Sequence, residues 1–144
     1  MKSKLLHDAN GQKTYALIFE KGDEVASGLL DFAKAQDLGA ASFTAIGALS
    51  DVTLGYFQRD KNEYKKIPFR EQVEVLSLIG DIATKDGTPK VHAHAVLGRS
   101  DASTIGGHLV EAHVWPTLEL VLTESRVHLR KQTDEETGLA LIQI

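Results

Sequence analysis

The stretch KVHAHAVLGRSDASTIGGHLVEAHVW, residues 90–115, holds four of the six histidines of the chain. Its first part, VHAHAVL, alternates between apolar and imidazole side chains. Successive side chains of a β-strand point to opposite faces, so His92 and His94 would share one face, and the apolar residues between and beside them would pack into a core on the other. The stretch therefore predicts a half-buried strand with two imidazoles on its open face.

The segment GRSDASTIGG, residues 98–107, follows this strand and is rich in turn-forming residues. A chain reversal there would carry His108 onto or near a neighbouring antiparallel strand, about 4.8 Å away. A third imidazole would then reach the point where His92 and His94 converge. We expect Gly106 and Gly107 to provide a positive φ angle or a close backbone approach at this place.

Three neutral imidazoles that meet at one point are a good site for Zn²⁺ or a similar borderline divalent metal. Structural zinc normally takes four protein ligands, whereas three ligands and an open position are typical of a catalytic or ligand-binding site. His113 is available as a fourth ligand, but its odd interval from His108 predicts the opposite strand face. We expect His113 to be a surface residue and the isolated His7 and His128 to be ordinary polar residues. The alternative interpretation of the cluster is half-exposed strand histidines with a structural role only.

The rest of the sequence predicts an α+β fold, with mostly antiparallel strands and one main helix. Apolar residues recur at helical spacing in DEVASGLLDFAKAQDLG, residues 23–39, with Asp23 as the expected N-cap and Gly39 just beyond the end. The run AASFTAIGALSDVTLGYFQ, residues 40–58, predicts two strands or one long strand bent at a glycine. No linker interrupts the 144 residues, so we expect a single domain over residues 1–144.

The composition limits the functional classes. Apolar residues make up 42% and charged residues 25%, as in an ordinary globular protein. The chain has no cysteine, so a metal would need His, Asp or Glu ligands. No apolar run approaches the roughly 18 residues of a membrane span, and the N-terminus lacks the apolar core of a signal peptide, so we expect a cytoplasmic protein. The chain has 16 Lys and Arg residues and 20 Asp and Glu residues, which gives a net charge of −4. This acidic balance makes DNA binding doubtful.

Glu119 is the acidic residue that we single out as a candidate catalytic side chain. It lies in PTLELVLTE, residues 116–124, where leucines alternate with other residues, so Glu119 is expected on the face opposite the leucines. There it could accept a hydrogen bond from a ligand imidazole or act as a general base. A solvent-facing strand glutamate is the alternative.

The ordered motifs resemble a known family. VEVLSLIGDIA, residues 73–83, has the Glu-x-Leu-Ser-Leu-x-Gly pattern, and residues 90–122 add the histidine strand, the Gly-x-x-Asp turn, Gly-Gly-His-Leu and Thr-x-Glu. This set resembles the PPC domain, the "plants and prokaryotes conserved" family. The resemblance implies an α+β fold with a mostly antiparallel sheet, assembly as a homotrimer, and a three-histidine metal site, which in this sequence corresponds to His92, His94 and His108.

The resemblance also implies several alternative functions. The family is often described as DNA-binding because plant members add an AT-hook, and no such basic segment occurs here. The fold is similar to that of acetolactate decarboxylase, a zinc enzyme, which implies a small oxygen-rich ligand such as a hydroxy or oxo acid. Three interpretations stay open: a metal protein with a small-molecule or catalytic site, a DNA-associated module, and an assembly domain with structural histidines.

Overall fold

The computed structural model describes residues 1–144, which form nine strands and one helix. Along the chain these are β1 (Lys2–Ala9), β2 (Gln12–Glu20), α1 (Val25–Ala35), β3 (Ala40–Gln58), β4 (Glu63–Phe69), β5 (Val73–Lys85), β6 (Thr88–Gly98), β7 (Thr104–Glu124), β8 (Arg130–Thr133) and β9 (Ala140–Gln143). The predicted fold, mostly antiparallel with one helix, is present. Strand β1, which the sequence did not reveal, pairs with β2.

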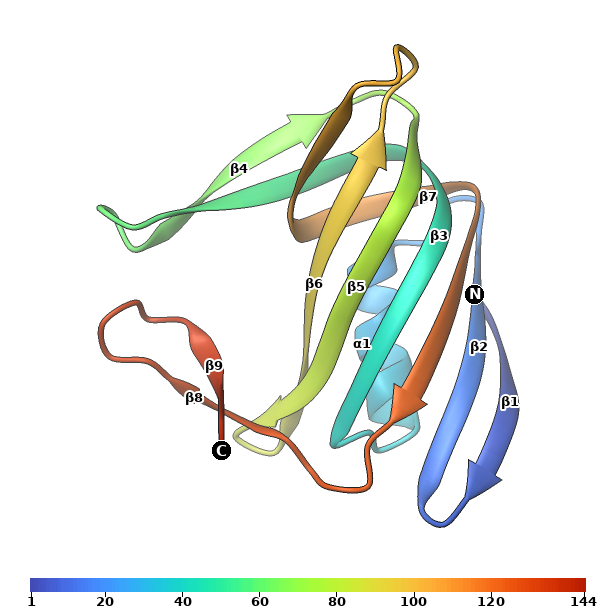
Figure 1. The fold of residues 1–144 in the computed structure, drawn as a ribbon, viewed down its shortest axis with the longest axis vertical. Coiled ribbons are helices and arrows are strands. Elements are labelled where there is room, and N and C mark those ends of the chain that lie inside the picture. The colour runs from blue at the N-terminus through green and yellow to red at the C-terminus, as the bar shows by residue number, and fades with distance from the viewer.

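The strands form one sheet in the order β1-β2-β7-β3-β5-β8-β9, and β4 pairs with β3. Strand β6 pairs with both β5 and β7, so β7, β3, β5 and β6 form a closed circuit (Figure 1). All pairings are antiparallel except the contact of β5 with β8, which is a single parallel pair, Thr84 with Arg130. Helix α1 lies behind the sheet in Figure 1, and at 11 residues it is too short to cross a membrane.

Helix α1 begins one residue later than the sequence predicted. Its N-cap is Glu24, not Asp23, because the longer side chain accepts hydrogen bonds from the backbone N–H groups of Ala26 and Ser27. The same carboxylate accepts from Ala112 N at 3.2 Å, which ties the start of the helix to β7. The helix also ends earlier than expected: Gln36 is the C-cap, so Gly39 lies outside the capping motif.

The two longest strands, β3 and β7, are each one continuous strand. β3 is the single long strand bent at a glycine, with a register shift at Gly47, whose φ is +153°. A Cβ atom at Gly47 would lie 2.3 Å from the Thr117 carbonyl oxygen, so the close backbone approach requires glycine. β7 continues through Pro116 as one strand, with a cis Trp115–Pro116 bond.

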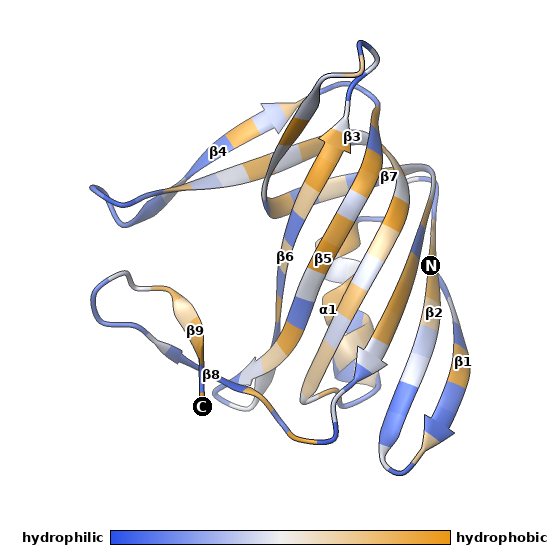
Figure 2. Ribbon diagram, in the orientation of Figure 1, coloured by the Kyte–Doolittle hydropathy of each residue, from blue (hydrophilic) through white to orange (hydrophobic).

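A core cluster of 27 buried residues lies between the sheet and α1. The helix contributes its buried residues at helical spacing: Val25, Leu29, Phe32 and Ala33. The strands contribute alternate residues, which Figure 2 shows as alternating orange and blue or white segments along β5 and β3. The opposite face of the sheet carries the histidines of β6, which are exposed, while Ala93, Ala95 and Leu97 are buried.

Gly80 of the Glu-x-Leu-Ser-Leu-x-Gly motif provides a test of this packing. A Cβ atom there would lie 2.3 Å from Phe43 Cζ and 2.4 Å from the His92 carbonyl oxygen. Gly80→Ala should therefore lower the free energy of unfolding by about 1–3 kcal/mol, measured by urea denaturation. At the control position Gly98 the nearest atoms, of Leu76, are 3.4 Å away, so Gly98→Ala should cost little. Equal stability of the two variants would contradict this packing.

Candidate metal centre

Three histidines converge on the open face of the sheet, as the strand spacing predicts. His92 and His94 alternate along β6, and His94 is directly opposite His108 on β7. One ligand nitrogen from each of the three residues lies within 4.8 Å of the others. His92 Nε2 and His94 Nε2 are 3.2 Å apart, close to the roughly 3.3 Å between two nitrogens on a tetrahedral zinc with bonds of about 2.0–2.1 Å.

Glycines let β7 approach its neighbours at this point. Cβ atoms at Gly106 and Gly107 would lie 2.9 Å from the Ala95 carbonyl oxygen and 3.0 Å from the Gly55 carbonyl oxygen. Neither glycine has a positive φ angle, so close backbone approach, one of the two expected reasons, applies. The narrow packing of β7 between β3 and β6 holds His108 over the histidine pair.

Asp81 of β5 contacts the cluster from the neighbouring strand. It is directly opposite His92 in the β5–β6 ladder, and its Oδ2 lies 3.3 Å from His92 Nδ1. Its Oδ1 lies 2.7 Å from Lys131 Nζ, an ion pair rather than a well-directed hydrogen bond. A carboxylate beside the second ring nitrogen orients a ligand imidazole and fixes its tautomer. Asp81 was not among the predicted site residues, although alternation along GDIA after the motif glycine puts it on the histidine face.

Tyr64 of β4 stacks on His108, with ring centroids 4.6 Å apart and an interplanar angle of 25°. The stacking depends on Gly55, which pairs with His108 in the β3–β7 ladder. A Cβ atom at Gly55 would lie 2.9 Å from Tyr64 Cδ1, so a side chain there would push the tyrosine ring aside. The β3–β4 hairpin thus supplies an aromatic wall for the cluster.

The surroundings of His94 and His108 favour the neutral imidazole that a metal ligand needs. Burial, followed by the nearby His92 and His94, lowers the pKa of His108 to about 4. Burial, followed by His92, also lowers the pKa of His94. Both imidazoles are therefore neutral at pH 7 and have free lone pairs for a metal. His108 Nδ1 is buried without a hydrogen-bond partner, a costly state for a polar atom that a bound cation at the cluster would help to offset. The donor set fits a borderline divalent metal.

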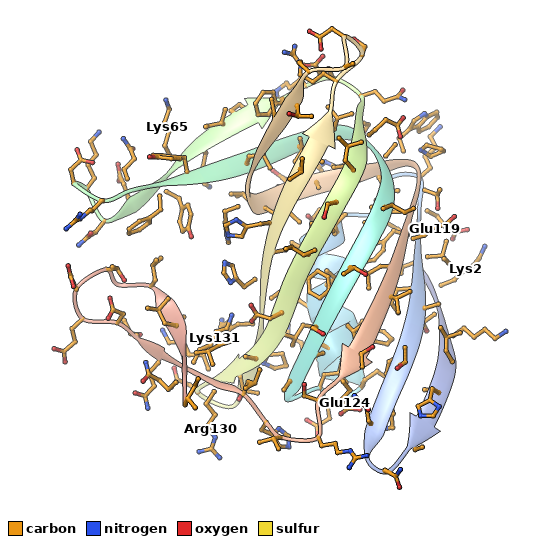
Figure 3. The ribbon with its side chains drawn as sticks, viewed as in Figure 1. Lys2, Lys65, Glu119, Glu124, Arg130 and Lys131 are labelled. Carbon is orange, nitrogen blue, oxygen red and sulfur yellow. The ribbon has the colours of Figure 1, made fainter.

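Glu119 does not join the cluster. It lies on the face opposite the buried leucines, as predicted, but pairs with Ile18 and Ile46. β3 and β5 separate its part of β7 from β6, a distance of about 14 Å at the usual strand spacing. Figure 3 shows Glu119 far from Lys131, the partner of Asp81. Glu119 therefore does not lie where it could accept a hydrogen bond from a ligand imidazole; the carboxylate beside the cluster is that of Asp81.

His113 lies outside the cluster, but not for the predicted reason. The β3–β7 register shifts between Thr53 and Leu54, so that Val110 of β7 is an extra residue. This shift resets the alternation: Leu109 and Ala112 are both buried, and His113, like His108, lies outside the core. His113 is outside the cluster because it lies farther along β7 than His108. His113 Nδ1 instead lies 2.8 Å from Asp51 Oδ1.

Comparison with known proteins identifies the family of the chain. The family model of the Plants and Prokaryotes Conserved (PCC) domain, abbreviated PPC above, matches residues 6–126. The chain belongs to this family. No functionally curated protein is significantly similar to the sequence.

Solved structures of PPC-like proteins are similar over nearly the whole chain. A PPC protein of Pyrococcus horikoshii is 34% identical, with 99% of this chain and 95% of that chain covered and a TM-score of 0.86. A metal-containing protein of Archaeoglobus fulgidus is 34% identical, with 92% and 94% covered and a TM-score of 0.83. A candidate DNA-binding protein of Bacteroides thetaiotaomicron is 25% identical, with 98% and 96% covered and a TM-score of 0.87.

The expected similarity to acetolactate decarboxylase is present at the level of the fold. A Staphylococcus aureus protein of unknown function, described as similar to that enzyme, gives a TM-score of 0.56 at 9% identity. The match covers 76% of this chain and 51% of the other. At this identity the likeness concerns the fold alone and does not transfer a reaction to the PPC chain.

The Asp51–His113 pair predicts a pH dependence of stability. The hydrogen bond to Asp51 raises the pKa of His113 above 6.5. The stability that the pair contributes is therefore lost as the pH rises through the raised pKa of His113. The His113 hydrogen bond lowers the pKa of Asp51 below 3.8, so it is also lost as the pH falls through the lowered value. Both side chains are over a third exposed, so the expected gain is below about 1 kcal/mol, largest between about pH 4 and 6.5.

Comparing urea denaturation of the wild type and Asp51→Asn across pH measures this contribution, and NMR titration follows His113 directly. In Asp51→Asn the pKa of His113 should move down toward its ordinary value. Asp60→Asn, with no ion pair in the structure, is the matched control and should leave it unchanged. An unaltered His113 titration in Asp51→Asn would contradict the assignment.

Proposed function

We propose that this PPC-domain protein is a homotrimer of single-domain chains in which His92, His94 and His108 bind one divalent metal, most simply zinc. In this proposal the open coordination position receives a small oxygen-rich molecule such as a hydroxy or oxo acid. The observation that carries the proposal is the convergence of three imidazoles beside a carboxylate, with an unpartnered buried nitrogen on His108. The metal-containing protein of Archaeoglobus fulgidus supports the same conclusion.

Zinc suits this donor set because imidazole nitrogen is among its usual ligands and the chain has no cysteine. When bound, the ion would supply a Lewis acid that attracts carbonyl, hydroxyl or carboxylate oxygen. The chain's own residues would do the rest: Asp81 orients His92, and Tyr64 holds the His108 ring by stacking. The proposal is one of binding and includes no general base.

Metal content after single substitutions tests the metal assignment. His94→Ala removes one of three ligands and should abolish stoichiometric metal, measured by elemental analysis of protein purified without a His-tag. His113→Ala is the matched control, because His113 lies on the same strand as His108 but outside the cluster. It should retain about one metal per chain. Equal metal content in the two variants, whether present or absent, would remove the assignment and favour structural histidines.

The homotrimer is supported by an exposed apolar patch on the histidine face of the sheet. Its members come from neighbouring strands: Ile18, Ile46, Leu76, Ile79, Val96 and Val121. Their side chains are 36–63% exposed, and a contiguous surface of this kind is typical of a protein–protein contact. Ile79 is directly opposite His94, so a second copy seated on the patch would lie beside the open side of the metal site.

Light scattering of the wild-type protein at micromolar concentration should give three times the 15.7 kDa chain mass. Ile46→Lys, which puts a charge into the patch where the side chain is 63% exposed, should lower the mass toward that of a monomer. Val127→Lys is the control, since Val127 is 74% exposed but outside the patch, and should leave the mass unchanged. A monomeric wild type would refute the trimer.

DNA binding is the second function that the comparisons raise, through the name of the Bacteroides relative. The net charge of −4 and the absence of an AT-hook-like segment weigh against it, because phosphate contacts need an excess of cationic side chains. We therefore propose no DNA-binding role. A specific, salt-dependent complex of sub-micromolar affinity would reverse this choice.

A further inference from the structure

Lys131 is the one charged residue among the buried residues of the chain, with 6% of its surface exposed. It lies on β8, in a C-terminal hairpin that follows the region matched by the family model, which ends at residue 126. A buried ammonium group is costly unless it is paired. Its partner is Asp81, at 2.7 Å, the residue whose other carboxylate oxygen faces His92 Nδ1. The hairpin therefore reaches the histidine cluster through a single charged side chain.

The hairpin is held in a defined register. Thr84 N donates to the Leu129 carbonyl oxygen at 2.9 Å, and Leu129 N donates to the Gly39 carbonyl oxygen at 3.3 Å. These bonds fix the start of β8 next to β5, so that Lys131 is buried while its neighbours Arg130 and Gln132 are exposed. Figure 3 shows the side chains of Lys131 and Arg130 on opposite sides of β8.

The far end of the hairpin has its own attachment. Asn62 Nδ2, in the turn between β3 and β4, donates to the Glu136 carbonyl oxygen at 2.8 Å. This bond joins the two hairpins that extend to the left in Figure 1. One of them carries Tyr64, which stacks on His108, and the other carries Lys131, which pairs with Asp81. The cluster is thus supported from both sides.

We propose that Lys131 is a positioning residue of the metal centre, and that the C-terminal hairpin completes a site built from the PPC fold. Its ammonium group attracts Asp81 Oδ1, which turns Oδ2 toward His92. Asp81 Oδ2, 3.3 Å from His92 Nδ1, favours the tautomer that carries its proton on Nδ1, which leaves His92 Nε2 free for the metal beside His94 Nε2. This inference rests on the proposed metal binding. It adds that tight metal binding requires Lys131 as well as the three histidines.

Zinc affinity, measured by competition with a chelator at pH 7, tests the inference. Lys131→Met should weaken zinc binding about 10- to 100-fold, the usual effect of losing a residue that orients a ligand. Lys85→Met is the matched control: Lys85 Nζ also joins β5 to β8, by a 2.7 Å hydrogen bond to Thr133, but far from the histidines. It should bind zinc as the wild type does.

A double-mutant cycle separates positioning from general stabilisation. If Lys131 acts through Asp81, Lys131→Met should weaken zinc binding no further in an Asp81→Asn background. An effect of the same size in both backgrounds, or a folded Lys131→Met protein with wild-type affinity, would overturn the inference. Lys131→Arg keeps the charge and should restore most of the affinity.

A measurement on the unaltered protein keeps the test decisive if Lys131→Met does not fold. NMR of the zinc-loaded wild type should show the His92 ring protonated at Nδ1 and bound through Nε2; the reverse tautomer would overturn the inference. The two proposals fail differently. A wild type that binds no zinc removes the proposed function, whereas zinc binding with normal affinity in Lys131→Met removes only the role of Lys131.

Discussion

The antiparallel pairing of β6 with β7 is the constraint on which the site depends. It sets His94 directly opposite His108, and alternation along β6 adds His92 on the same face. β7 contacts β6 and β3 in its first part and β3 and β2 in its second. The same constraint closes the circuit of strands around the core, so that fold and site have a common origin.

Short-range periodicity explains what the sequence could reveal. The two-residue spacing of His92 and His94 and the turn before Gly106 were enough to predict the cluster, because alternation and a tight reversal are local properties. The glycine bend of β3 was predictable for the same reason. The ordered motifs predicted the family and therefore its fold, and the family model matches the chain.

The errors occurred where local patterns depend on tertiary contacts. Glu119 has the expected face but the wrong neighbours, because two strands separate its part of β7 from β6. His113 was assigned by counting residues across a bulge that no local signal indicates. Lys131 was missed because its contact with Asp81 depends on a parallel pairing of β5 with β8, between segments 45 residues or more apart in the sequence. Likewise, the N-cap is Glu24 and not the predicted Asp23, and the Glu24 carboxylate also accepts a hydrogen bond from Ala112 N of β7.

The main conclusion to be tested is that the three histidines hold a metal. Anomalous diffraction at the zinc absorption edge tests it most directly, on crystals of protein purified without a His-tag and supplied with one equivalent of zinc. We expect one strong peak per chain, within bonding distance of nitrogens from His92, His94 and His108, and with Asp81 beside His92 rather than on the metal. A peak elsewhere, such as at the Asp51–His113 pair, or no peak at the three histidines, would contradict it.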